Sequence, residues 1–262
     1  MIIYIFVQTN STKPVESMVK ADIINKLQRE VFSMQGFKKP LQSEQIFTGL
    51  SSIEKSFPNR IFPTGVVHEF ISHAQESSAA TNGFISGLTG CLMQKGGVCI
   101  WIGTQRTLFP PTLKVFGIDP DRVIFIDLTR PKDALWAIEE ALKCNALTAV
   151  VGEIREMTFT ESRRLQLAVE ESKVTGFIHR FQPRNKNTVA CVTRWQIEPI
   201  ASVLEDSMPG VGSPRWNVQL LKVRNGKTGT WQIEWLENGF RDITMQVFDL
   251  SKVQQLKTGS YA

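Results

Sequence analysis

The sequence predicts a layered α/β fold in which helices pack on a mainly parallel sheet that ends in antiparallel strands. Its first sign is a set of continuous apolar runs, which are typical of strands buried on both faces. These runs are residues 65–71, 98–102, 123–126, 147–151 and 177–178. Helical patterns separate them, as expected for parallel strands joined by right-handed crossovers. Near the C-terminus, Asn225-Gly226 lies between two alternating runs and predicts an antiparallel hairpin.

Residues 1–61 are predicted to form an N-terminal helix and a linker. Within 15–35, four apolar side chains recur at heptad-like spacing: Ile24, Leu27, Val31 and Met34. This stripe needs a partner surface, either on its own domain or on another subunit, so it is a candidate partner or homo-oligomer contact. The apolar first seven residues are too short to span a bilayer and lack a cleavage site. They are interpreted as an extra edge strand or a start codon assigned too early, and we expect a cytoplasmic protein without membrane contact.

Residues 62–240 are predicted to form the core. Helices are expected over 82–94, 131–143 and 160–175, where Gly176 suits the C-terminal cap of the last one. An alternating run over 189–197 and hairpin strands over 216–221 and 230–236 then add the antiparallel edge. Residues 241–262 read as a polar tail, either disordered or a peptide that folds on a partner.

Composition sets limits on function. The formal net charge of +5 and pI of about 9.1 favour an anionic partner such as nucleic acid, although an ordinary soluble surface carries the same excess. The four cysteines form no C-x-x-C pair and lie among apolar neighbours, so we expect buried free thiols in a reducing compartment. The three histidines fit no zinc motif, so no metal site is expected.

One short segment sits where a phosphate loop would lie, between the first apolar run and a helical stretch. It reads Glu76, Ser77, Ser78, Ala79, Ala80, Thr81. A phosphate loop needs glycines that let backbone N–H groups curl around phosphate, a lysine for the β- and γ-phosphates, and a hydroxyl for magnesium. Only the hydroxyl could survive, in Thr81, because Ala80 stands at the lysine position and Ala79 at the glycine before it.

The surroundings strengthen this interpretation, because an ordered set of segments resembles the RecA-type recombinase core. Within that superfamily the sequence is most similar to the ImuA family, whose relative SulA shares the fold. The resemblance spans Phe62 to Leu236 and is carried by residues 62–65, 132–137, 163–168, 176–178, 192–195 and the hairpin with Trp231. It implies a three-layer RecA-like core.

The resemblance also identifies two other positions that ATP hydrolysis requires. The glutamate that activates water in RecA-type ATPases is matched by Gln105, which cannot take a proton from water. The magnesium-side aspartate is matched by Gly152, with Glu153 one residue later and therefore on the opposite face of the strand. With Ala80, three requirements fail together, so we expect a degenerate ATPase site, no enzyme activity and no bound cofactor.

RecA-type proteins bind DNA through two loops, which match residues 153–159 and 182–188 here. The second loop is basic, and its candidate DNA-binding residues, with two neighbours in the flanking strands, are Arg180, Arg184, Lys186 and Arg194. A solvated basic turn is the alternative. Lys222 and Arg224 match positions that reach a neighbouring subunit in RecA-type filaments, so they are candidate partner contacts.

The resemblance implies a non-catalytic accessory protein of DNA-damage-induced translesion synthesis, acting as a scaffold or adaptor on damaged DNA. Its implied partners are an ImuB-like Y-family polymerase homologue and a C-family error-prone polymerase, with DNA and a second copy of the chain as further candidates. Two alternatives remain open: a weak DNA-dependent ATPase that borrows a lysine from elsewhere, and a SulA-like cell-division inhibitor.

Overall fold

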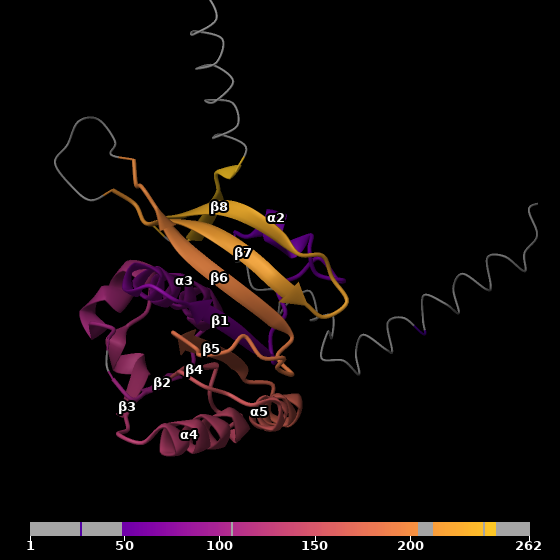
Figure 1. Ribbon diagram of the computed structural model, residues 1–262. Helices are drawn as coiled ribbons and strands as arrows, with labels where there is room; N and C mark the ends of the chain where they lie inside the picture. Colours follow the sequence, from indigo (N-terminus) through magenta and orange to yellow (C-terminus); the bar gives the residue numbers. More distant parts are fainter. Residues whose placement is uncertain (1–26, 28–48, 106, 204–211, 238, 245–262) are drawn as a thin grey trace, which may run out of the picture. The chain divides into compact units, whose positions relative to one another are not determined.

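The computed structural model describes residues 27, 49–105, 107–203, 212–237 and 239–244 (Figure 1). The chain divides into two units, Met1–Lys39 and Pro40–Ala262. Of the first unit only Leu27 is described; it is helical and 55% exposed. The predicted contacts at Ile24, Val31 and Met34 lie outside the described residues.

The second unit is built on a sheet that has nine strands within the described part of the chain, in the order β3-β2-β4-β5-β1-β6-β7-β8-β9. The strands from β3 to β6 run parallel, whereas β6 to β9 are antiparallel neighbours. The strands are β1 (Val67–Ser72), β2 (Cys99–Gly103), β3 (Val123–Asp127), β4 (Ala149–Ile154), β5 (Thr175–Phe181), β6 (Thr193–Ile200), β7 (Arg215–Val223), β8 (Gly229–Leu236) and β9 (Gly239–Asp242). This is the mixed α/β sheet that the apolar runs predict.

Helices cover the two faces of this sheet in separate layers (Figure 1). The helical elements are α2 (Ser51–Glu54), α3 (Gln75–Met93), η2 (Pro110–Phe116), η3 (Pro120–Arg122), α4 (Pro131–Lys143) and α5 (Phe159–Ser172). One buried cluster joins α3 to β1, β6 and the antiparallel strands, and a second joins α4 and α5 to the opposite face. The alternation of side chains along β1 divides it between them, because Val67 belongs to the second cluster and Phe70 to the first.

Most predicted elements are confirmed, and the differences have local causes. The helix expected over 131–143 has those bounds, with Pro131 and Asp133 in its first turn. The predicted cap at Gly176 is wrong: α5 ends at Ser172, Lys173 takes the left-handed conformation (φ 65°), and Gly176 lies inside β5. The start of α5 carries a capping box between Thr158 and Glu161.

The hydrophobic core extends beyond the segment 62–240. Leu50, Ile53 and Phe57 are almost fully buried in the cluster that also holds α3. At the other end, β9 continues to Asp242, and Ile243 is buried. The division into linker, core and tail stays a prediction.

Candidate functional site

The segment expected to form a phosphate loop is helical. Only His73 and Ala74 separate the end of β1 from α3, which begins at Gln75, so Glu76 to Thr81 form its first turns. The backbone N–H of Ser78 donates to the carbonyl of Ala74 as the helix opens. Backbone N–H groups that are bonded within a helix cannot curl around a phosphate. The predicted start of this helix, residue 82, is therefore wrong, because the helix begins at residue 75.

The side chains of this segment serve the fold. Ala80 is 7% exposed and belongs to the core cluster around α3. The Thr81 hydroxyl, the one group that could bind magnesium, donates to the carbonyl of Ser77 at 2.7 Å. Ser77 in turn donates to the carboxylate of Glu198 in β6. A carboxylate of the chain itself thus occupies the helix N-terminus, which favours negative charge.

Gly152 and Glu153 face opposite sides of the sheet, as predicted from their adjacent positions on β4. A Cβ atom on Gly152 would lie 2.4 Å from Ile138 Cδ1, so the close packing of α4 on β4 leaves no space there for an aspartate. Glu153 points instead toward α3, where its Oε1 accepts hydrogen bonds from Asn82 at 3.1 Å and from the Trp101 indole at 2.9 Å. The carboxylate of Glu153, the residue after Gly152, is therefore engaged by hydrogen bonds within the protein.

Glu153 is the half-buried end of a polar chain at the carboxyl ends of the central strands, whose other members are buried. The Asn82 amide oxygen lies 2.8 Å from His179 Nδ1, and His179 Nε2 lies 2.6 Å from the Ser72 hydroxyl. Burial raises the pKa of the Glu153 carboxyl, although three side chains donate hydrogen bonds to it. Burial lowers the pKa of His179 to about 4, so its imidazole is neutral at pH 7. Ser72 is fully buried, so this chain of hydrogen bonds offers no accessible nucleophile.

Gln105, at the position of the water-activating glutamate, is exposed in the bend after β2. In the polar chain, Ser72, His179 and Asn82 are buried and Glu153 is half-buried, and all four are bonded to other side chains. The predicted degenerate positions therefore lie in three different settings: Ala80 in the core, Gly152 against α4, and Gln105 in solvent.

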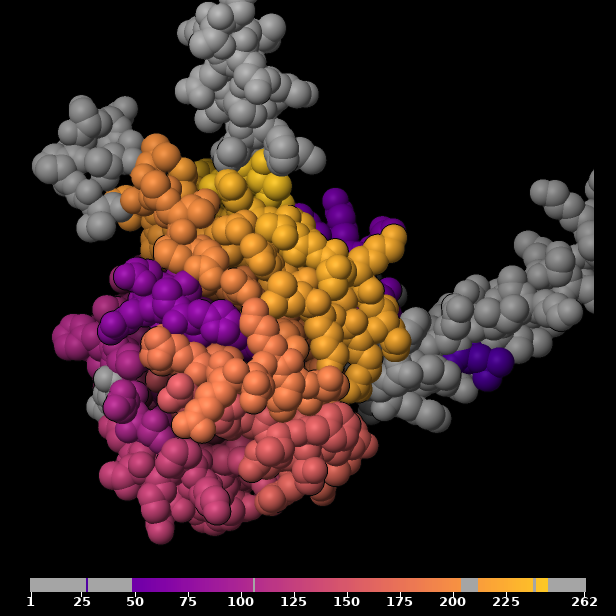
Figure 2. Space-filling model, viewed as in Figure 1, coloured from indigo at the N-terminus to yellow at the C-terminus, as the bar shows by residue number. Residues whose placement is uncertain are grey.

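A crossover of residues 182–192 connects β5 to β6 and lies on the face of the sheet that α5 covers. The two strands flank β1, so the connection crosses β1 without any helix. Figure 2 shows the orange surface of this part of the chain between the purple surface of α3 and the pink surface of α5. Residues 189–192 of the crossover are buried and residues 184–186 are exposed. Without helical hydrogen bonds, its backbone groups must find partners in other segments or in water.

Cationic side chains supply those partners. Arg180, which is fully buried, donates to the Asn185 carbonyl at 3.3 Å, and Arg194 donates to the Asn187 carbonyl at 2.6 Å. Arg180 and Arg194 also bind the two oxygens of Glu69, at 2.8 and 2.5 Å. The sequence predicts that both arginines contact DNA, and in this structure their guanidinium groups are occupied inside the protein.

The two residues predicted as partner contacts in β7 and after it have similar tasks. Lys222 Nζ donates to the Val189 carbonyl at 2.7 Å, and Arg224 Nη2 donates to the Ala190 carbonyl at 2.9 Å. Burial lowers the pKa of Lys222. Both hydrogen bonds hold the end of the crossover against β7 and the residue that follows it. A partner protein could contact only the parts of these two side chains that are exposed.

The two loops matched to DNA-binding loops are tied together. Glu156, in the first loop, accepts from the backbone N–H of Arg184 at 2.8 Å, and Asn187 donates to the carbonyl of Met157 at 2.8 Å. Arg184 and Lys186 are exposed at the outer part of the crossover. Their predicted contact with DNA stays a prediction.

The residues that sequence reasoning missed are polar side chains in apolar surroundings. Glu69 lies within the first apolar run, Asn82 begins a predicted helix and His179 follows the run 177–178, and all three are buried. A charged residue in the middle of a strand buried on both faces was the available signal, because such a charge needs a buried partner.

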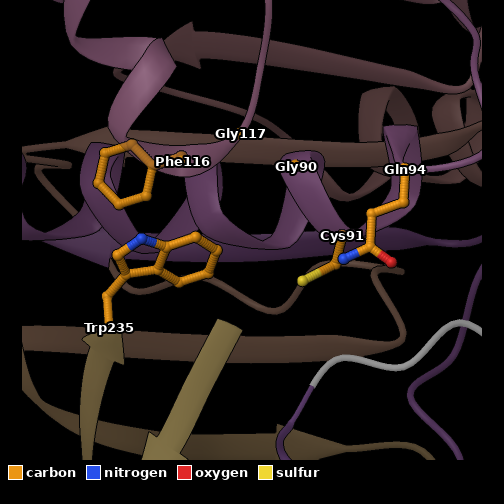
Figure 3. A pocket seen from close by; sticks show the side chains of 6 residues that line it. All are labelled: Gly90, Cys91, Gln94, Phe116, Gly117 and Trp235. Carbon is orange, nitrogen blue, oxygen red and sulfur yellow. The ribbon is translucent and has the colours of Figure 1, made fainter. Parts of the chain in front are cut away.

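A small cavity lies at the other end of α3 (Figure 3). Its volume is about 210 Å³, and its lining comes from α3, the end of η2, and β8: Gly90, Cys91, Gln94, Phe116, Gly117 and Trp235. Small-molecule sites usually have a volume of at least about 300 Å³. The cavity is smaller, and it lies beside the last turns of α3, far from residues 76–81 in the first turns.

Metal clusters and membrane spans are both absent from the part of the chain that the structure describes. Within it, no group of three or more histidine, cysteine, aspartate or glutamate side chains could hold a metal ion. None of the described helices combines the length and the apolar character that a membrane span requires.

Comparison with known proteins finds two kinds of relative. The chain is 32% identical to protein ImuA of Caulobacter vibrioides over 203 residues. This alignment covers 73% of this chain and 83% of that protein. Over 117 residues the chain is 25% identical to the cell division inhibitor SulA of Yersinia pestis, which covers 45% of this chain and 68% of that protein. No family model matches the chain.

Proposed function

The chain belongs to the ImuA family, and on this basis we propose that it is a non-catalytic accessory protein of DNA-damage-induced mutagenesis. In this proposal it acts as a RecA-fold scaffold or adaptor for an error-prone polymerase complex on damaged DNA. The partners that the resemblance implies are an ImuB-like Y-family polymerase homologue and a C-family error-prone polymerase.

One observation supports the non-catalytic part of the proposal more than any other. α3 starts two residues after β1, and Glu198 bonds to its first turn, in the segment where the resemblance to RecA-type proteins would place a phosphate loop. A γ-phosphate there would meet a carboxylate and no lysine. A phosphate and a carboxylate in contact would repel each other, so this geometry supports a protein that does not bind ATP.

Titration with a fluorescent ATP analogue and magnesium tests this part, with and without single-stranded DNA. We expect no saturable binding at millimolar nucleotide. The variant Glu198→Gln is the matched control, because it removes the charge at the helix N-terminus and retains the size of the side chain. Micromolar binding to the parent protein would refute the inference that the chain does not bind ATP and would direct attention to a lysine outside the segment.

Co-purification with the Y-family polymerase homologue tests the scaffold part. We expect a stable complex whose formation depends on neither ATP nor magnesium, since no step of assembly is assigned to a nucleotide. A protein that stays separate from both polymerases during size-exclusion chromatography at micromolar concentration would argue against the adaptor role.

The division-inhibitor alternative has less support. The similarity to SulA covers 45% of this chain, whereas the similarity to ImuA covers 73%. A sedimentation assay with the tubulin-like division protein separates the two, because only an inhibitor would reduce the amount of pelleted polymer.

A further inference from the structure

Glu69 lies at the centre of the buried contacts beneath the crossover. It is fully buried in β1, and each of its two carboxylate oxygens accepts from a different arginine: Arg180 from β5 and Arg194 from β6. Without the charge of Glu69, two guanidinium groups would lie close together in a poorly solvated space.

Each arginine also donates to the crossover, and Arg180 donates in addition to the Arg155 carbonyl and to Glu156. Arg180 Nη1 donates to the Asn187 Oδ1 at 3.0 Å, and its Nη2 donates to the Asn185 carbonyl. Arg194 Nη2 donates to the Asn187 carbonyl. The carboxylate thus sets where both guanidinium planes lie, and these planes set the path of residues 185–187.

Apolar side chains could fill this space but could not make these hydrogen bonds. Well-packed apolar residues often replace a buried ion cluster without loss of stability, so stability alone does not explain these charges. An apolar cluster would take these arginine donors away from the carbonyls of exposed Asn185 and half-buried Asn187, and only water or other groups could then bind them. The ionic groups therefore determine the conformation of the crossover as well as filling space.

We propose that Glu69 is a positioning residue that holds the crossover in one preformed shape, so that Arg184 and Lys186 are presented to the phosphate backbone of single-stranded DNA. The nucleic-acid part rests on the proposed function; the positioning part rests on the contacts above. A preformed surface loses less conformational entropy when it binds, and this raises affinity.

The charges exposed around this surface favour an anion. Arg155 is exposed and its Nε donates to the Gln182 carbonyl at 2.9 Å, beside exposed Arg184 and Lys186. Glu156 is the acidic group among them, and its carboxylate is engaged by Arg180 and by the Arg184 backbone. Three cations against one bonded carboxylate fit a phosphate-bearing ligand.

The test compares three variants of the full chain by amide hydrogen exchange and by anisotropy of a labelled single-stranded oligonucleotide. Glu69→Gln removes the central charge. The triple change E69M/R180M/R194M replaces the cluster by apolar side chains and is expected to fold. R184S/K186S removes the exposed cations and leaves the cluster intact. Amides of α3 serve as the internal reference for global stability.

In Glu69→Gln we expect amides of residues 182–190 to exchange about tenfold faster, while those of α3 do not change. We also expect weaker binding to DNA. Weaker binding would distinguish positioning from a simple charge effect. Glu69→Gln raises the net charge by one, so electrostatics alone would strengthen binding to DNA. R184S/K186S should keep the exchange of the parent and lower the salt dependence by about 1.4 log units per log unit, at roughly 0.7 per contact.

The outcomes separate the two parts. If the crossover exchanges at the parent rate in both Glu69→Gln and the triple variant, Glu69 does not position it. Should Glu69→Gln fail to fold, the triple variant tests through the same amides whether the ion cluster as a whole positions the crossover, and an unchanged exchange rate would overturn the positioning role. If the parent binds no oligonucleotide while the exchange of the crossover changes as expected, the positioning role holds and DNA is overturned as the ligand.

Discussion

Replacing Gly152 by alanine tests whether packing prevents an aspartate at the magnesium-side position. The added Cβ would lie 2.4 Å from Ile138 Cδ1, 2.9 Å from its Cγ1 and 3.3 Å from Ile178 Cδ1. Ile138 is fully buried in the cluster between α4 and the sheet, so it can yield only by moving the helix or leaving its rotamer. Overpacking of this kind costs about 1–3 kcal/mol. We therefore expect Gly152→Ala to lower the free energy of unfolding by that amount.

A double-mutant cycle measured by urea unfolding with tryptophan fluorescence gives the decisive comparison. Ile138→Val removes the atom that lies closest and alone costs about 0.5–1.5 kcal/mol. The double variant should be more stable than the sum of the two effects predicts, by about 1 kcal/mol. Gly239→Ala is the matched control, because its Cβ would meet nothing within 4 Å. Additive effects, or a Gly152→Ala variant as stable as the control, would refute the steric explanation.

Three further predictions follow from burial. Restoring the glycine and lysine with A79G/A80K should not create ATP binding in the fluorescent titration, and should destabilise the chain by about 2 kcal/mol or more, because position 80 is in the core. Burial lowers the pKa of His68 and of His179 to about 4, against 6.5 in the unfolded chain. The unfolded chain therefore binds more protons between these values. Stability present above pH 6.5 should fall by up to about 3 kcal/mol per histidine as the pH drops toward 4, which urea unfolding at several pH values would measure. Of the four thiols only that of Cys144 is exposed, so a chromogenic disulfide should titrate one fast thiol per native chain, and four fast thiols would contradict the burial.

The sequence was sufficient for most of the fold. Continuous apolar runs mark strands buried on both faces, and β2, β3 and β5 lie where such runs predict them. The Asn-Gly turn between β7 and β8 is also confirmed, with Asn225 in a left-handed conformation (φ 57°). These elements follow from local patterns, because burial on both faces and turn geometry each leave a signature within a few residues.

The start of α3 and the exposure of Cys144 could not be predicted in this way. Small polar residues such as Ser77 and Ser78 are typical of loops, yet both are buried in α3, which is enclosed by the sheet and by the antiparallel strands. Tertiary packing outweighed local preference there. Cys144 has apolar neighbours in sequence but follows the last residue of α4, where the chain turns at the surface, so the expectation of a buried thiol is wrong at this position.

The roles of the basic residues could not be predicted for a different reason. A sequence pattern that places basic residues beside a loop does not distinguish a DNA-binding surface from a buried support for that loop. Both roles need hydrogen-bond donors at the same positions. The distinction depends on residue 69, which is more than 110 positions away from Arg180 and becomes its neighbour only when β1 enters the sheet beside β5. The roles of these basic residues therefore depend on partners that are distant in the sequence, which local patterns do not reveal.

Two of the predicted departures from a RecA-type ATPase, Ala80 and Gly152, are each required by local packing, whereas Gln105 is exposed. Ala80 lies in the core because α3 starts directly after β1, and Gly152 is required because α4 lies close to β4. A lysine at position 80 would need a longer loop to reach solvent, and an aspartate at position 152 would need α4 to move. Restoring one residue at a time should therefore lower stability without gaining nucleotide affinity, since each change conflicts with a neighbour that the present fold requires. Ala80 and Gly152 thus contribute to the packing of α3 and α4 on the sheet.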